Sequence, residues 1–245
     1  MVKKTHRTVF VAGASGAIGR RLCPMLVSDG WFVFGTTRSS AKAPVLCELG
    51  VEPVIVNVFD RTSLVDFVCK AQPDVVIHQL TDLPPGLDAS KMAEARIRNA
   101  RLREVGTRNL VTAAIAAGAK RLVAQSIAFA YVPGSTPYRE DAPLNVDDPN
   151  MGLTARAVAS LEQQVLAAPL EGIVLRYGKL YGPGTGFSTP QSDGSLHVDA
   201  AADAALRAAT RGAAGIYNIA EDDGTVCSDK AMDALGWRAN FRSHT

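Results

Sequence analysis

The sequence predicts an α/β protein built on a doubly wound parallel sheet, with helices on both faces and a small, reduced C-terminal lobe. An apolar run at residues 8–12 leads through a glycine turn into a helical pattern. Strand and helix patterns then alternate along most of the chain. The strand patterns are nearly continuous apolar runs, which is typical of parallel strands covered on both faces.

The bulk composition is that of an ordinary globular protein. The chain has 245 residues, of which 47% are hydrophobic and 20% charged, with a formal net charge of +2. This balance predicts neither a nucleic-acid nor a membrane partner, and no apolar run reaches the about 18 residues of a membrane span. The start MVKKTHR leads straight into a strand, so we expect no signal peptide and a cytoplasmic protein. The scattered cysteines and histidines predict neither disulfides nor a metal site.

The first strand and helix frame a turn with glycines at positions 13, 16 and 19. The first glycine lets the chain leave the strand, the second lets the backbone approach a pyrophosphate, and the third lets the helix pack on its strand. Backbone amides and the helix dipole would face the anion, whereas the alternative is a glycine-rich turn without a ligand. The predicted dinucleotide contacts on this Rossmann sheet are Gly13, Ser15, Gly16, Ala17, Ile18 and Gly19.

The residues at the end of the second strand, predicted at 31–37, determine whether NAD(H) or NADP(H) is preferred. An acidic side chain there would accept a hydrogen bond from a free ribose hydroxyl, but Arg38 and Ser39 follow the strand instead. A guanidinium pairs with a 2′-phosphate, and Lys42 is near enough in sequence to assist. These residues favour NADP(H) over NAD(H), with a solvent-exposed loop arginine as the alternative for Arg38.

The remaining elements follow in order. Strands are predicted at 54–58, 74–80, 120–126, 173–177 and 216–219, and helices at 44–49, 62–70, 87–117, 153–168 and 228–235. An alanine-rich helix is also predicted after residues 197–199, ending near Gly212. Asp60 or Thr62 is the expected N-cap of the 62–70 helix. The stretch 181–194 is loop-like, rich in Gly, Pro and Ser. We therefore expect a cofactor-binding core at 1–180 and a small substrate-side lobe at 181–245, within one structural domain.

Several segments together resemble the extended short-chain dehydrogenases/reductases, the NAD-dependent epimerase/dehydratase family. They are GASGAIG at 13–19, PDVVIHQ at 73–79, GTRNLVTAA at 106–114, KRLVAQS at 120–126, LRYGKLYGPGT at 175–185, HVDAAADA at 197–204 and SDKAMDALGW at 228–237. The resemblance runs essentially from end to end. It implies a homodimer through the helices at 87–117 and 153–168, and a small-molecule substrate.

The resemblance also implies roles for individual residues. Asn57 and Val58 would contact the adenine, and Gln79 and Leu80 would line the cofactor. Tyr177 and Gly178 would flank the nicotinamide. Ser126 matches the active-site serine of the family, which hydrogen-bonds the reacting oxygen.

The sequence departs from the family at the catalytic acid and its lysine. The expected Tyr-x-x-x-Lys is missing, because Met151 or Gly152 stands where the tyrosine belongs and Arg156 is the candidate replacement for the lysine. Arg103 also stands where the family usually has asparagine. Tyr131 is the preferred substitute acid, and its alternative is a packing residue at the cleft edge.

Three functions follow from these patterns. The first is an NAD(P)-dependent oxidoreductase that transfers hydride to or from a small carbonyl or hydroxyl substrate, with NADP preferred. The second is a non-catalytic NADP(H)-binding sensor or scaffold, which the missing tyrosine and lysine favour. The third is a sugar-nucleotide epimerase or dehydratase, which the short stretch between Gly186 and His197 disfavours.

Overall fold

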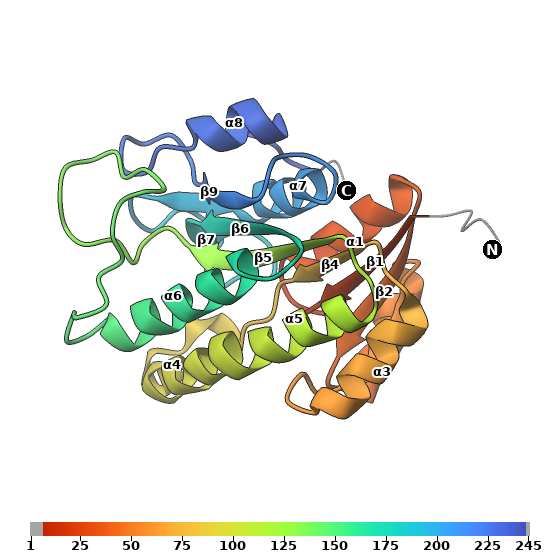
Figure 1. Ribbon diagram of the computed structural model, residues 1–245. Helices are drawn as coiled ribbons and strands as arrows, with labels where there is room; N and C mark the ends of the chain where they lie inside the picture. The colour runs from red at the N-terminus through yellow and green to blue at the C-terminus, as the bar shows by residue number, and fades with distance from the viewer. Residues whose placement is uncertain (1–6, 244–245) are drawn as a thin grey trace.

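The computed structural model describes residues 7–243 and shows one seven-stranded, all-parallel sheet (Figure 1). The strand order is β3-β2-β1-β4-β5-β6-β9. The bounds are β1 Arg7–Ala12, β2 Trp31–Thr37, β3 Glu52–Ile55, β4 Val75–His78, β5 Arg121–Ile127, β6 Glu171–Tyr177 and β9 Gly215–Ile219. This confirms the predicted doubly wound sheet. The order reverses between β1 and β4, which is where such sheets open a cleft for a ligand.

Helices cover both faces of the sheet, as Figure 1 shows. Helices α1 (Gly19–Ser28), α2 (Ala43–Glu48) and α7 (Val198–Ala208) pack on one face, around Val9, Val11 and Leu22. Helices α3 (Arg61–Ala71), α5 (Thr107–Ala116) and α6 (Gly152–Leu166) pack on the other, around Phe10 and Val76. Successive residues of β1 therefore serve opposite cores, which explains its unbroken apolar run.

The helix predicted at 87–117 is divided into several pieces. Two short turns, η2 (Pro85–Leu87) and η3 (Ala89–Lys91), precede α4 (Met92–Arg101), and a π-helical turn η4 (Leu102–Gly106) joins α4 to α5. Positive φ angles of 64° at Gly86 and 55° at Leu87 prevent an earlier helical start. The late start of α4 and the π turn between α4 and α5 are the two features of this segment that hydrophobic periodicity did not predict.

The C-terminal residues add to the main sheet and to its cores. Strand β9 pairs with β6, while β7 (Lys179–Tyr181) and β8 (Ser195–His197) form a separate two-stranded parallel pair. Helix α8 (Asp229–Leu235) lies beside β9 and buries Leu235 in the same core as α7. The prediction missed β7 and β8 because each is only three residues long.

One expectation of the sequence analysis falls on residues outside the described range. Residues 1–6, on which the expectation of no signal peptide rests, lie outside it, as do residues 244–245. None of the helices between residues 7 and 243 combines the length and apolarity needed to cross a bilayer.

Candidate active site

A cavity of about 940 Å³ opens at the carboxyl ends of the central strands. The glycine turn after β1, the end of β2 and the residues after β4 line one part of it. The α4–η4 segment, the start of α6 and the loop after β7 line the rest. It therefore lies at the reversal point of the sheet, where an α/β fold binds its ligand.

The glycine turn presses closely against β4. Gly13 has φ +95°, and a Cβ built there would lie 2.7 Å from the carbonyl oxygen of Gln79. A Cβ at Gly19 would overlap the carbonyl oxygens of Gly13 and Ala14. Only glycine fits these two positions, because the atoms in the way belong to the backbone.

The same turn presents amides without a protein partner. Within residues 7–243 the backbone N–H groups of Ser15, Ala17 and Ile18 donate to no protein acceptor. They precede α1, whose N-terminal end carries a partial positive charge. Such a cluster fits the pyrophosphate of a dinucleotide.

A second unsatisfied group lies at the end of β4. Gln79 is buried, and its Nε2 donates to the Tyr177 hydroxyl at 3.3 Å. Its Oε1 accepts no hydrogen bond from the described residues. Tyr177 in turn donates to the carbonyl of Ala201 at 3.1 Å, and burial raises the pKa of its hydroxyl. Gln79 thus offers an acceptor to a ligand, whereas the Tyr177 proton is already committed.

Arg38 and Ser39 line the cavity just after the end of β2. The Nη2 of Arg38 donates to Oδ1 of Asp82 at 3.3 Å, which links the end of β2 to the loop after β4. The Arg38 side chain is 60% exposed. No carboxylate follows β2 directly, as the sequence shows.

Most of the predicted cofactor contacts line this cavity. They are Gly13, Ser15, Gly16, Ala17, Ile18, Arg38, Ser39, Val58, Gln79, Leu80, Tyr177 and Gly178. Gly19 lies beneath the turn, against the carbonyls of Gly13 and Ala14. Asn57 is exposed and turns back to accept the amide of Phe59 at 3.1 Å, so its side chain is used locally.

The predicted catalytic serine points away from the cavity, which requires a correction. Ser126 donates to Oε1 of Glu162 at 2.7 Å and is 1% exposed. Its neighbours Gln125 and Ile127 line the cavity instead. Side chains alternate along a strand, so a one-residue difference in register places the hydroxyl on the opposite face.

The two other predicted catalytic side chains also lie elsewhere. The Tyr131 hydroxyl donates to Asn218 at 2.5 Å and accepts from Arg176 at 3.1 Å, and burial raises its pKa. Arg156 is exposed and donates to the carbonyl of Val146 at 2.6 Å. Neither lines the cavity, so the geometry supports neither as acid nor as replacement for the missing lysine.

Side chains other than the three predicted catalytic ones line the cavity near the start of α6. Met151 and Thr154 reach it from the start of α6, and Arg103 reaches it from η4. Burial lowers the pKa of Arg103 to about 10, an effect that the nearby Glu162 opposes, so the guanidinium stays charged at neutral pH. The sequence marked Arg103 only as a departure from the family, and no pattern indicated that a π turn would carry it.

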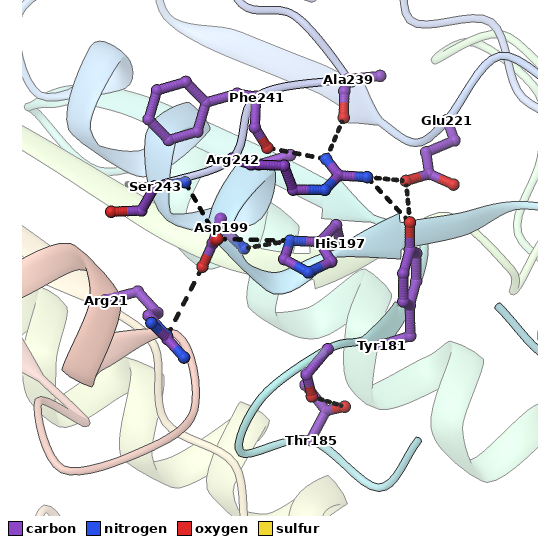
Figure 2. Close-up of polar contacts among 12 residues, drawn as sticks. Arg21, Tyr181, Thr185, His197, Asp199, Glu221, Ala239, Phe241, Arg242 and Ser243 are labelled. Atoms are coloured by element: carbon purple, nitrogen blue, oxygen red, sulfur yellow. Dashed lines mark hydrogen bonds and ion pairs between the residues drawn. The ribbon is translucent and has the colours of Figure 1, made fainter. Parts of the chain in front are cut away.

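The C-terminal residues 242–243 contact the cavity-lining Tyr181 and its neighbours (Figure 2). Arg242 donates to the Tyr181 hydroxyl at 3.0 Å and to Glu221 at 3.2 Å, and Tyr181 donates to Glu221 at 2.7 Å. The Ser243 amide donates to Asp199 at 3.1 Å, and Asp199 also lies 3.6 Å from Arg21 of α1. Tyr181 lines the cavity, so the chain end and α1 together hold its wall in place.

Comparisons with known proteins agree with this geometry. A profile described as the NAD dependent epimerase/dehydratase family matches residues 9–195. A 3-diazoavenalumate denitrifying reductase from a Streptomyces species is 43% identical over 237 residues, covering 88% of this chain and 76% of that protein.

Solved structures share the fold over nearly the whole chain. The Bordetella bronchiseptica enzyme WbmG in complex with NAD superposes with a TM-score of 0.75 at 17% identity, covering 99% of this chain and 92% of that one. A UDP-glucose 4-epimerase from Thermotoga maritima with UDP-glucose gives 0.72 at 18% identity, covering 96% and 94%. At these identities the two structures establish the fold alone.

Proposed function

The chain belongs to the NAD-dependent epimerase/dehydratase family, and from this premise we propose that it is an NADP(H)-dependent reductase that transfers hydride to a small organic substrate. The observation that carries the proposal is the composition of the cavity. Orphaned turn amides and the free Oε1 of Gln79 fit a dinucleotide. Among residues 7–243, the two tyrosines that line the cavity, Tyr177 and Tyr181, already donate their hydroxyl protons to Ala201 and Glu221.

A cavity in which the described tyrosine protons are already donated to protein acceptors favours a substrate that needs no proton. When bound, the cofactor supplies a hydride. Hydride addition to the carbon that bears the diazonium group of an aromatic ion needs no proton, because the C–N bond breaks and its electron pair leaves with dinitrogen. The relative named as a 3-diazoavenalumate denitrifying reductase supports this substrate class. The residues of this chain would then bind and orient the substrate and exclude water. Orientation alone supplies a large part of a rate enhancement.

Deuterium transfer tests this proposal. The purified protein is mixed with an arenediazonium carboxylate and NADPH labelled at either of the two C4 hydrogens. We expect only one label to reach the carbon that lost dinitrogen, because the bound cofactor presents one face. Equal transfer of both labels would indicate spontaneous reduction in solution. Tight NADPH binding without turnover of this probe or of simple aldehydes would instead favour the sensor.

The preference for NADP(H) rests on Arg38, with Ser39 and Lys42 beside it at the same end of the cavity. Calorimetry with NADP⁺ and NAD⁺ tests it on wild type and Arg38→Ala. Loss of a charge-assisted phosphate contact should weaken NADP⁺ binding by about tenfold or more and leave NAD⁺ binding nearly unchanged. Equal affinity of the wild type for both nucleotides would overturn the choice of cofactor.

The surface of the α4 and α6 helices supports a homodimer. Ile97 on α4 is 63% exposed and Leu153 on α6 is 41% exposed, and the two helices pack side by side. Exposed apolar side chains on adjacent helices favour burial against a second copy. Sedimentation that finds only monomer at high protein concentration would contradict this part of the proposal.

A further inference from the structure

One face of the α4–η4 segment lines the cavity with three polar side chains and one methionine. They are Met92, Arg96, Asn99 and Arg103. Their spacing of four, three and four residues places them on one side of the helix. This wall therefore carries two guanidinium groups with an amide between them.

These two arginines have no carboxylate partner. Within residues 7–243 no acidic side chain lies at ion-pair distance from Arg96 or Arg103. Arg98, on another face of the same helix, pairs with Asp82 at 3.4 Å and with Glu94 at 3.5 Å. Asp82, which lines the cavity, is thus paired with Arg98 and not with Arg96 or Arg103.

The cavity as a whole has an excess of positive charge. Its lining includes six cationic side chains, Arg20, Arg38, Lys42, Arg96, Arg103 and Lys179, and one carboxylate, Asp82. Asp82 already pairs with Arg38 and Arg98. Arg103 is partly buried, and its charge is opposed by burial and favoured by the nearby Glu162, with which it forms no ion pair. A bound anion would offset the cost of burial.

The surroundings indicate which anion. Arg20, Arg38 and Lys42 lie near the glycine turn and β2, where the phosphates of the dinucleotide are proposed to bind. The α4–η4 wall instead shares the cavity with four apolar side chains, Met92, Phe129, Met151 and Phe187. These side chains suit a flat apolar body that carries one negative group.

We propose that this wall is a carboxylate subsite, in which Arg103 binds the carboxylate of an aromatic acid while Arg96 stands at the entrance. The guanidinium of Arg103 would meet the carboxylate with two parallel hydrogen bonds. The inference rests on the proposed function only in taking the aromatic acid to be the substrate of the reductase. It adds a specificity-determining residue that hydride chemistry alone does not require.

Equilibrium binding of two matched probes tests the subsite without turnover. Calorimetry compares trans-cinnamate with its neutral amide, trans-cinnamamide, on protein saturated with NADP⁺. We expect the wild type to bind the carboxylate about tenfold or more tightly than the amide. Arg103→Gln should remove that preference while the affinities for the amide and for NADP⁺ stay unchanged, and Arg103→Lys should restore part of it.

Arg108→Gln is the matched control, since it removes the same charge from an exposed position of α5. It should retain the preference for the carboxylate. Equal binding of both probes by the wild type, or loss of NADP⁺ affinity in folded Arg103→Gln, would overturn the proposal, the latter by giving Arg103 to the cofactor. If Arg103→Gln does not fold, Arg103→Lys and Arg96→Gln provide the comparison. Failure to transfer hydride would refute the reductase and leave these binding results intact.

Discussion

Buried polar side chains at the ends of β5 and β6 form a hub beneath the cavity. Arg176 makes a double ion pair with Glu162, with Nε–Oε1 at 2.8 Å and Nη2–Oε2 at 2.7 Å. Ser126 and Tyr131 complete the hub through Glu162 and Arg176. Burial opposes the charge of Arg176, but Glu162 holds the pKa of the guanidinium above its usual value. These contacts mark a structural group, because every polar atom they use is already paired.

Replacement of Ser126 separates this structural role from the catalytic role that the sequence predicted. Ser126→Ala removes one hydrogen bond to a carboxylate that keeps both contacts to Arg176, so we expect a stability loss of about 1.5 to 3 kcal/mol. Affinity for NADP⁺ should be unchanged, since the side chain does not line the cavity. Denaturant unfolding and calorimetry measure the two effects. Full stability with abolished turnover would return the serine to the reaction centre.

His78 gives the protein a pH dependence. Its Nδ1 accepts the Leu80 amide at 3.2 Å and its Nε2 lies 3.1 Å from the Thr107 hydroxyl, an arrangement that suits the neutral ring. Burial, together with the charge of Arg103, lowers the pKa of His78 from 6.5 to about 4. Between these values the unfolded chain binds a proton that the native state does not, so stability falls as pH decreases.

The expected size of this effect is about 3 kcal/mol between pH 6.5 and pH 4. His78→Asn, which cannot titrate, should be less stable at neutral pH but should lose less stability over the same pH interval. Denaturant unfolding at a series of pH values gives both slopes. Parallel slopes for the two proteins would show that carboxylates, and not His78, dominate the acid response.

At the scale of elements, the sequence predicted what depends on strong local patterns. Strand β2 begins and ends where predicted, and Asp60 caps α3 by accepting the Ser63 amide at 3.1 Å. The site could be predicted where backbone shape determines it, as at Gly13. It could not be predicted where it depends on which face of a strand a side chain takes, as at Ser126, or on a π turn, as at Arg103. Hydrophobic periodicity indicates neither feature.

The turn between β1 and α1 permits a matched test of close packing. Gly13 and Gly30 both have positive φ, +95° and +80°, but a Cβ at Gly13 would meet the backbone of Gln79 whereas one at Gly30 meets nothing within 4 Å. Gly30→Ala should therefore cost about 1 to 2 kcal/mol, the backbone strain alone.

Gly13→Ala should cost a further 1 to 3 kcal/mol, by rough estimate for overpacking, and should abolish NADP⁺ binding because the turn must move away from β4. Thermal unfolding and calorimetry of the two variants make the comparison. Equal destabilisation by the two substitutions would show that the turn moves freely and that its contact with β4 does not shape the site.

At the scale of the whole molecule, distant parts of the chain meet at the cavity. The turn after β1 lines it, and residues 242–243 contact the cavity-lining Tyr181 and, through Asp199, the helix α1 that follows the turn (Figure 2). The net charge of only +2 is distributed unevenly, since the cavity collects six cations and one carboxylate. A cleft of one sign draws an oppositely charged ligand inward even when the molecule as a whole is nearly neutral.

This field predicts that NADPH associates more slowly as salt is added. The Debye length falls from about 30 Å at 0.01 M to about 8 Å at 0.15 M ionic strength. Added salt therefore screens the attraction between the cations of the cavity and an approaching ligand. Stopped-flow association rates should decrease several-fold over that range. Arg96→Gln should flatten the dependence, while Lys70→Gln, which removes the same charge from the last turn of α3, outside the cavity lining, should not. Equal flattening by both substitutions would assign the attraction to the net charge and not to the cleft.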